Sequence, residues 1–191
     1  NISLDQEFNS LLGFTADEME QLFSAFGQDY AAHRSVLDEW YNHYHFHKQG
    51  GASITNSDMA LYYLQRLDRS GNPPDELIDH NVRIDYGKLR YLVQIDRTLN
   101  GNFSRLREII ETGEQVGDIQ VSFPVEAVLQ TENLVSLLYY LGLLTFAGER
   151  EGTPLLKIPN RTIRQLLYGY LREAYQEGEI FQPSAWTIGE K

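Results

Sequence analysis

Three histidines within five residues are the first side chains in this sequence whose spacing could do chemistry. They are His43, His45 and His47. If the helix expected over residues 29–44 continues, His43 and His47 lie one turn apart and could share a divalent metal ion. The sequence contains no cysteine, and no third ligand can be identified. We therefore expect exposed histidines at a helix end and no metal site, with His43 and His47 as the weak candidate ligands.

Basic residues near the C-terminal helix form the second candidate site. Asn160 can cap a helix whose first turns carry Arg161 and Arg164, so backbone N–H groups and guanidinium groups could together hold an anion. With Lys157, these arginines are our candidate contacts to an anion or to nucleic acid. The simpler interpretation, which we favour, is that arginines near a hairpin form surface ion pairs.

Motifs for catalysis are missing from the sequence. No stretch reads G-x-x-x-x-G-K-S/T, and no nucleophile lies beside a base. Asp38 and Glu39 are adjacent and point to different faces of a helix, which makes them poor partners in an acid–base pair. The aromatic residues at positions 40, 41, 44 and 46 recur at helical spacing, so we expect them in the core and not stacked on a base. No enzymatic activity is expected from this chain.

Composition indicates a globular chain with an acidic balance. The 191 residues are 42% hydrophobic and 12% aromatic, which suits one domain or two small ones. A net charge of −11 opposes binding to nucleic acid and anionic lipid, although residues 143–175 are slightly basic. We find no leader-like segment and no apolar run long enough to span a bilayer. With the absence of cysteine, these features lead us to expect a cytoplasmic protein with no membrane partner.

The first 70 residues carry helix signals. Thr15 and Glu18 can form a capping box before an apolar stripe, which predicts a helix of about three turns. Apolar spacing predicts a second helix over residues 29–44. A third helix, capped at residue 56 or 57, is expected to end at the glycine- and proline-containing link over residues 70–74. That link is a candidate boundary between two subdomains.

The rest of the chain combines helices with a hairpin. Apolar spacing predicts helices over residues 86–96 and before Gly113, and alternation over residues 119–123 predicts a short strand or extended arm. A helix between Thr131 and Gly142 is followed by strands over residues 143–147 and 155–158 and by the final helix. This order is that of the closing half of a winged-helix domain, with the hairpin as the wing, and many unrelated folds share it. We predict a mainly α fold with one small β-hairpin.

Several segments spread over nearly the whole chain form a recognisable set. They are N-I-S-L (1–4), E-F-N (7–9), L-G-F-T (12–15), W-Y-N with Y and F (40–42, 44, 46), N-V-R (81–83), D-Y-G-K-L (85–89), N-L-V-S-L-L-Y-Y-L-G-L-L (133–144) and K-I-P-N-R (157–161). This set resembles a bacterial family of predicted AAA-ATPase-like proteins, in which residues 40–46 read W-Y-N-G-Y-x-F. Two segments depart from the family: His43 stands where it usually has glycine, and Thr55-Asn56-Ser57 replaces its usual Tyr-Asn-Pro, so that residues 43, 55 and 57 differ.

The resemblance implies an architecture. In that family a phosphate-binding loop and an acidic metal-binding strand lie upstream of the matching region, and a restriction-endonuclease-like domain often lies downstream. The resemblance therefore implies a helical lid-like subdomain over residues 1–70, a helical, winged-helix-like subdomain over residues 71–178, and a tail or linker over residues 179–191. It implies ATP and Mg²⁺ only for the missing core, carries over no catalytic residue, and leaves this chain without a cofactor.

Two functional hypotheses follow from these observations. The first is a non-catalytic regulatory and interaction module, a lid with a winged-helix-like arm, which works with the ATPase core of the same polypeptide and with a nuclease domain. The alternative is a DNA-binding module, in which the last helix or the hairpin places an associated nuclease on DNA. The sequence favours the first because the overall charge is strongly negative.

Overall fold

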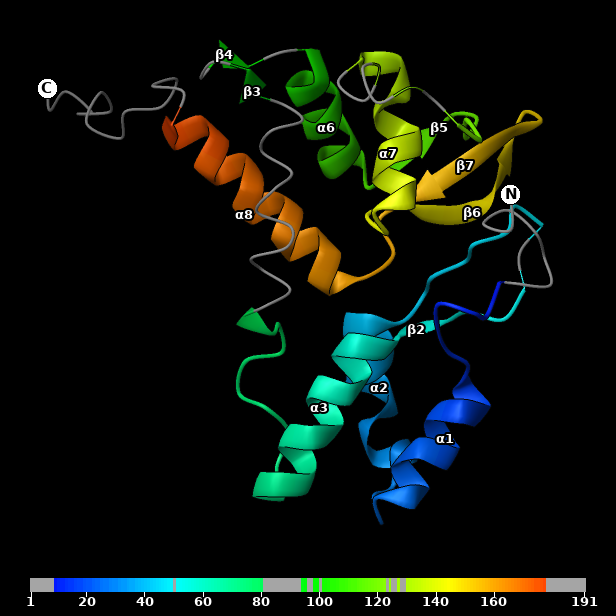
Figure 1. The fold of residues 1–191 in the computed structure, drawn as a ribbon, viewed down its shortest axis with the longest axis vertical. Helices are drawn as coiled ribbons and strands as arrows, with labels where there is room; N and C mark the ends of the chain where they lie inside the picture. The colour runs from blue at the N-terminus through cyan, green and yellow to red at the C-terminus, as the bar shows by residue number, and fades with distance from the viewer. Residues whose placement is uncertain are drawn as a thin grey trace, which may run out of the picture.

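The computed structural model describes residues 9–49, 51–80, 94–95, 98–99, 101–122, 124, 127 and 130–177. This part of the chain is mixed but mainly helical, with three small antiparallel sheets. Helices α1 to α3 form a first unit, and the later helices gather around a three-stranded sheet to form a second (Figure 1). The helices are α1 (Ala16–Ala25), α2 (Tyr30–Tyr41), α3 (Ser57–Ser70), α6 (Gly101–Thr112), α7 (Leu134–Tyr140) and α8 (Arg161–Glu177).

Local sequence signals account for the ends of the first three helices. The Thr15 side chain accepts a hydrogen bond from the Glu18 backbone N–H, and Glu18 Oε2 accepts one from the Thr15 N–H at 2.8 Å, so the predicted capping box is confirmed. Asn56 caps α3, and Gly71 ends it with a left-handed φ of 72°. The strands β1 (Gly13–Phe14) and β2 (Thr55–Asn56) pair antiparallel and bring the starts of α1 and α3 together.

The first unit has its own hydrophobic core. Met19 and Phe23 from α1, Leu37 and Tyr41 from α2 and Tyr63 from α3 are completely buried in it. Burying one large apolar side chain stabilises a fold by about 1.5–3 kcal/mol, so the burial of these side chains favours the packing of the three helices on one another. The expectation that the aromatic residues of α2 belong to the core is confirmed for Tyr41.

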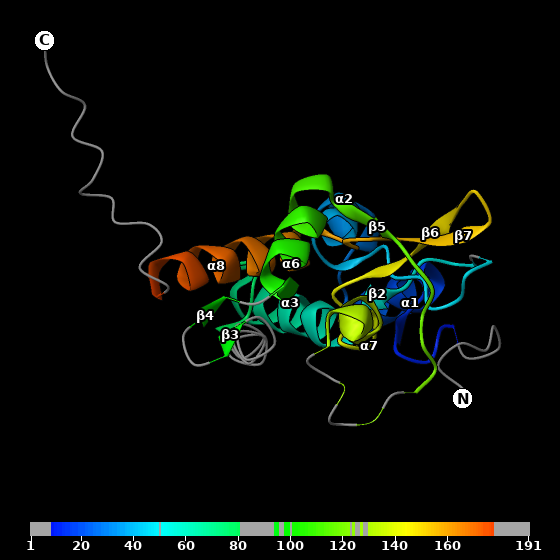
Figure 2. The ribbon, with the colours of Figure 1, turned by 90° about the horizontal axis from the view of Figure 1, so that it is seen from above.

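The second unit is built around an antiparallel sheet in the order β5-β7-β6. Its strands are β5 (Glu114–Val116), β6 (Thr145–Arg150) and β7 (Thr153–Lys157), and a 3₁₀ turn, η4 (Thr131–Asn133), leads into α7. The predicted hairpin is confirmed as β6 and β7, although β6 begins two residues later than expected. Figure 2 shows that this hairpin and α8 extend in opposite directions from the centre of the molecule.

The third strand of the sheet was not expected from the sequence. Strand β5 pairs with β7 through all three of its residues. Only Val116 is apolar, so the sequence shows no alternating pattern that would predict a strand here. The strand or extended arm expected over residues 119–123 is not a strand over residues 119–122, and Phe123 lies outside the described residues.

Two residues from the first part of the chain lie in the core of the second unit. Tyr44 and Ile54 are 4% and 1% exposed and join the apolar cluster formed by α6, α7, the sheet and α8. Their backbones bond to each other, since the Tyr44 N–H donates to the Ile54 carbonyl and the Ile54 N–H donates to the Tyr44 carbonyl. The second unit therefore takes in residues that precede the expected boundary near residue 70.

Some predictions fall on residues that the structure does not describe. The helix expected over residues 86–96 lies largely outside the described residues, but Gln94 and Ile95 form β3, which pairs with β4 (Thr98–Leu99), so the helix is wrong at that end. The tail expected over residues 179–191 also lies outside them. Within the described ranges, none of the helices combines the length and apolar character needed to cross a bilayer.

Candidate functional site

The connecting segment, residues 42–47, leads the chain from the first unit into the second. Helix α2 ends at Tyr41 because Asn42 is extended, with φ −92° and ψ −165°, and His43 has a left-handed φ of 73°. The helix therefore ends three residues earlier than predicted. The apolar spacing continues to Tyr44 because that side chain is buried in the second core, and not because the helix continues.

This geometry corrects the arrangement expected for the histidines. His43 and His47 do not lie one turn apart on a helix, because both follow the end of α2. His47 Nδ1 accepts a hydrogen bond from the Gln49 N–H at 3.2 Å, while the His43 N–H donates to the Asn42 side chain. Among the described residues, no three histidine, aspartate or glutamate side chains lie where they could hold a metal ion together.

The connecting segment is hydrogen-bonded to the second unit along strand β6. The buried Thr145 hydroxyl accepts from the His45 N–H and donates to the His45 carbonyl at 2.8 Å, and the Phe146 N–H donates to the same carbonyl at 3.1 Å. The Tyr139 hydroxyl donates to the Phe46 carbonyl at 2.9 Å, and burial raises the pKa of Tyr139, which keeps it a donor. The segment is thus held as an extra chain at the edge of the sheet.

Asn160 joins the two units through a single buried side chain. Its Nδ2 donates to the Asn42 carbonyl at 3.0 Å, and its Oδ1 accepts from the Ile163 N–H at 3.2 Å. One side chain therefore satisfies the carbonyl that follows α2 and a free N–H of the first turn of α8. Asn160 is only 7% exposed, so water cannot readily replace these bonds. The predicted cap is confirmed, and its second bond lies 118 residues away in sequence.

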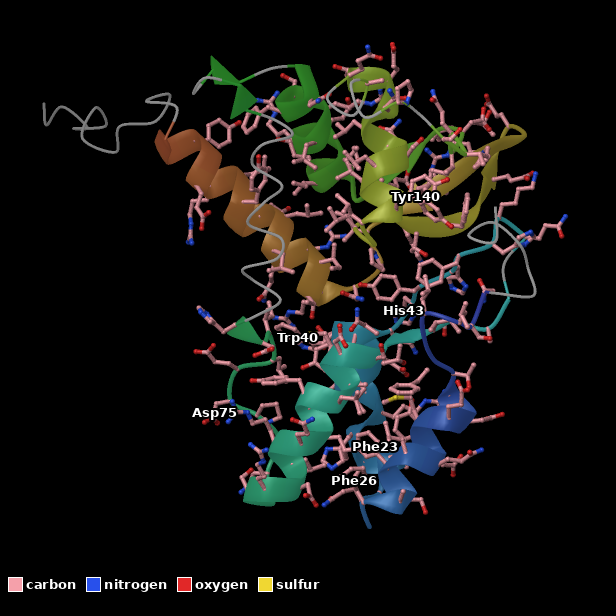
Figure 3. The ribbon with its side chains drawn as sticks, viewed as in Figure 1. Phe23, Phe26, Trp40, His43, Asp75 and Tyr140 are labelled. Carbon is pink, nitrogen blue, oxygen red and sulfur yellow. The ribbon has the colours of Figure 1, made fainter. Side chains whose placement is uncertain are left out.

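Arg161 also lies at the junction between the two units. Its Nη1 is 2.6 Å from Glu39 Oε1, and its guanidinium lies 4.7 Å from the centre of the Trp40 ring. Trp40 and His43 both lie where the first unit meets the second (Figure 3). Because Arg161 and Glu39 are each about half exposed, this pair contributes at most about 1 kcal/mol. The surface ion pair that we favoured for this arginine is present, and it links α8 to α2.

The other two basic candidates have different neighbours. The Arg164 guanidinium lies beside Gly113 at the end of α6, and a Cβ added to Gly113 would lie 3.0 Å from its Nη2. The positive charge is stabilised there by the negative end of the helix dipole. Lys157 lines a hollow on the other side of its strand from Leu156, together with His45 and Lys48. The structure therefore does not gather Lys157, Arg161 and Arg164 around one site.

The hollow beside the hairpin has a volume of about 610 Å³. Its lining comes from the connecting segment with the two residues after it and from strands β6 and β7. Burial lowers the pKa of His45, with smaller contributions from the charges of Lys157 and His43, so this imidazole is neutral at physiological pH. A neutral imidazole and two lysines are a donor-rich set, which the sequence did not reveal because residues 48 and 157 are far apart.

The sequence contained only part of the signal for the junction. The capping role of Asn160 and the exposed arginines could be read from their places at a helix start. The partners of these residues could not be predicted from the sequence. Only the fold brings Asn160 to Asn42 and Arg161 to Glu39, and it likewise brings Thr145 to the connecting segment. Comparisons of the chain with protein-family models, with curated proteins and with solved structures gave no match.

Proposed function

We propose that this chain is a non-catalytic regulatory and interaction module of a larger AAA-ATPase-like protein. In this proposal the first unit is the helical lid and the second is a winged-helix-like arm. The ATPase core of the same polypeptide holds ATP and Mg²⁺, and a nuclease domain is a further partner. The observation that carries the proposal is the backbone at residues 43 and 57, two of the three positions where the sequence departs from the family it resembles.

At position 43 the backbone suits the residue that the family uses. His43 has a φ of 73°, in the left-handed region that glycine enters at no steric cost and that other L-residues enter at a cost of about 1–2 kcal/mol. Glycine is the usual family residue at this position. The family's glycine in W-Y-N-G-Y is therefore the residue best suited to the left-handed backbone at residue 43, which we expect if this chain shares the family's turn.

At position 57 the backbone again suits the family residue. Asn56 caps α3 and Ser57 is the first residue of the helix, the place where proline is most favoured because its missing N–H would be unpaired anyway. Asn56 has φ −58° and ψ 122°, a conformation that a following proline permits. The family's Asn-Pro at residues 56 and 57 is compatible with this backbone, which supports a shared fold at a second position.

The topology of the second unit supports the winged-helix-like arm. Along the chain the elements run α6, β5, α7, β6 and β7, and in the sheet β7 lies between β5 and β6. This order of helix, strand, helix and hairpin is similar to that of a winged-helix domain, with β6 and β7 in the place of the wing, and α8 follows it. Fold alone does not specify a partner, so this topology supports the proposal but does not carry it.

The junction suits a part that transmits movement. The lid-like unit is connected to the arm at several separate points. These are the hydrogen bond of Asn160 to Asn42, the bonds between His45 and Thr145, and the burial of Tyr44 and Ile54 in the second core. A displacement of the first unit, caused by nucleotide in a neighbouring core, would therefore carry the second unit with it.

Hydrogen exchange of the full gene product, measured with and without Mg-ATP, tests this proposal. We expect ATP to change the exchange of amides in α1 to α3 and in α7 and β6 together. The Asn160→Ala variant should keep the change in the first unit and reduce it in the second, whereas Arg69→Gln, an exposed change on α3, should alter neither. If ATP changes exchange in neither unit, the proposal is wrong.

DNA binding by the hairpin is the second candidate function, and one observation favours it. Lys157 and Lys48 face the same hollow beside the hairpin, and Arg164 is exposed near it in sequence. Anisotropy of a fluorescent duplex at low and physiological salt tests the idea, with Lys157→Glu and Arg164→Glu as variants and Arg69→Glu as the matched control. Salt-sensitive binding that only the first two variants lose would favour DNA binding, and our leading proposal predicts no binding at physiological salt.

A further inference from the structure

The hollow beside the hairpin opens at an irregularity in strand β6. The pairing of β6 with β7 shifts register between Phe146 and Gly148, which leaves Ala147 without a partner across the strand pair. The connecting segment follows the other edge of β6 only as far as Phe146, where the last bond to His45 is made. The pairing with β7 is therefore interrupted next to the point where the connecting segment bonds to β6, and the hollow lies there. Bulges of this kind often adjoin binding sites because they redirect the backbone.

Gly148 leaves the backbone of the bulge open to a ligand. It has a φ of 116°, which side-chain-bearing residues rarely adopt, and nothing lies within 4 Å of the place where a Cβ would be. A residue without a side chain beside open space allows a ligand to approach the main chain closely. Ala147, its neighbour, is exposed. The wall of the hollow thus presents backbone as well as side chains.

The charged side chains around the hollow favour an anion. Lys48 and Lys157 bring two positive charges, and Glu149 brings one negative charge, in a chain whose net charge is −11. No ion pair joins either lysine to another described residue. The Nδ1 atom of His45 is shielded from solvent and has no hydrogen-bond partner among the described residues, so no contact there fixes the tautomer of the ring. The imidazole can therefore offer either a donor or an acceptor at its other nitrogen.

We propose that this hollow binds a phosphate-class anion, held by Lys48, Lys157 and His45 against the backbone of the bulge at Ala147 and Gly148. Lysine is a common point-charge ligand of phosphate, and hydrogen bonds between ionised partners are about twice as strong as neutral ones. A volume of about 610 Å³ lies within the range of small-molecule sites, which exceeds what phosphate alone needs and leaves room for the group that carries it. The site is independent of the proposed lid function.

Amide NMR spectra of the ¹⁵N-labelled chain provide the test. Inorganic phosphate is titrated into the millimolar range at constant ionic strength, and a nucleoside monophosphate and a short DNA duplex are titrated separately. We expect saturable shifts of the Ala147 and Gly148 amides, and affinity about tenfold lower in Lys157→Gln and in Lys48→Gln. Arg69→Gln, the same charge change at the far end of α3, should leave the affinity unchanged.

The three titrations also distinguish the source of the phosphate. Tighter binding of the monophosphate than of inorganic phosphate, at the same amides, assigns the site to a small organic phosphate. Binding of the duplex alone at these amides, lost in the lysine variants, assigns it to a nucleic-acid backbone. If none of the three gives saturable shifts at Ala147 and Gly148, or if the lysine variants bind as well as the unaltered chain, the proposal is overturned.

Discussion

Replacing His43 with glycine should stabilise this protein. His43 has a φ of 73°, and its side chain is exposed, so the substitution removes backbone strain and loses little packing. The relief is about 1–2 kcal/mol, because a Cβ in the left-handed region approaches the following carbonyl. Glycine also adds freedom to the unfolded chain, which costs about 0.5–1 kcal/mol. At the middle of these two ranges the expected net gain is about 0.75 kcal/mol. The hydrogen bond from the residue 43 N–H to Asn42 is retained, since it is made by the backbone.

Urea denaturation measures this gain directly, because the midpoint moves while the slope stays unchanged. In a chain of this length the gain corresponds to a rise of about 1–4 °C in Tm. His43→Ala is the matched control, since it removes the same imidazole but keeps the Cβ, and it should be no more stable than the unaltered chain. A glycine variant that is less stable than the alanine variant would refute the left-handed conformation at residue 43, and with it our strongest support for the family resemblance.

Three further predictions follow from the same structure. Asn160→Ala should destabilise the fold by about 2–4 kcal/mol in urea denaturation, because it leaves the Asn42 carbonyl and the Ile163 N–H buried and unpaired, and a loss below about 1 kcal/mol would show that water replaces the bridge. Ser57→Pro should stabilise by about 0.4–1 kcal/mol, since the backbone already has the conformation that proline needs, whereas a decrease would contradict the helix start at residue 57. Because burial lowers the pKa of folded His45 below its unfolded value near 6.5, the unfolded chain binds more protons, and stability should fall as pH decreases below about 6.5. His45→Gln should lessen that fall between pH 7 and pH 5, and an unchanged pH profile would contradict the burial of this imidazole.

The sequence was most informative where structure is local. The capping box at Thr15 and Glu18 and the cap of α8 at Asn160 could be predicted, and the cap of α3 could be narrowed to residue 56 or 57, because the residues that form each cap are within a few positions of one another. The β6–β7 hairpin could be predicted for the same reason. These signals depend on hydrogen bonds that form within one turn.

Structure that depends on distant partners was missed. Strand β5 contains one apolar residue in three and exists because β7 offers it a free edge. The end of α2 was placed three residues late because Tyr44 continues the apolar spacing, although its burial comes from the second core. The hollow near Lys157 was also missed, because Lys48 and Lys157 are far apart in the sequence and only the fold brings them to the same place. Local patterns do not contain such contacts.

Mg-ATP hydrolysis, measured side by side on this chain alone and on the full gene product, tests the central claim most directly. Our account predicts saturable hydrolysis by the full gene product only, because it assigns the nucleotide-binding core to a part of the polypeptide outside this chain. The account also predicts that the activity changes when the junction is weakened by Asn160→Ala. Saturable hydrolysis by a clean preparation of this chain alone would contradict a non-catalytic module.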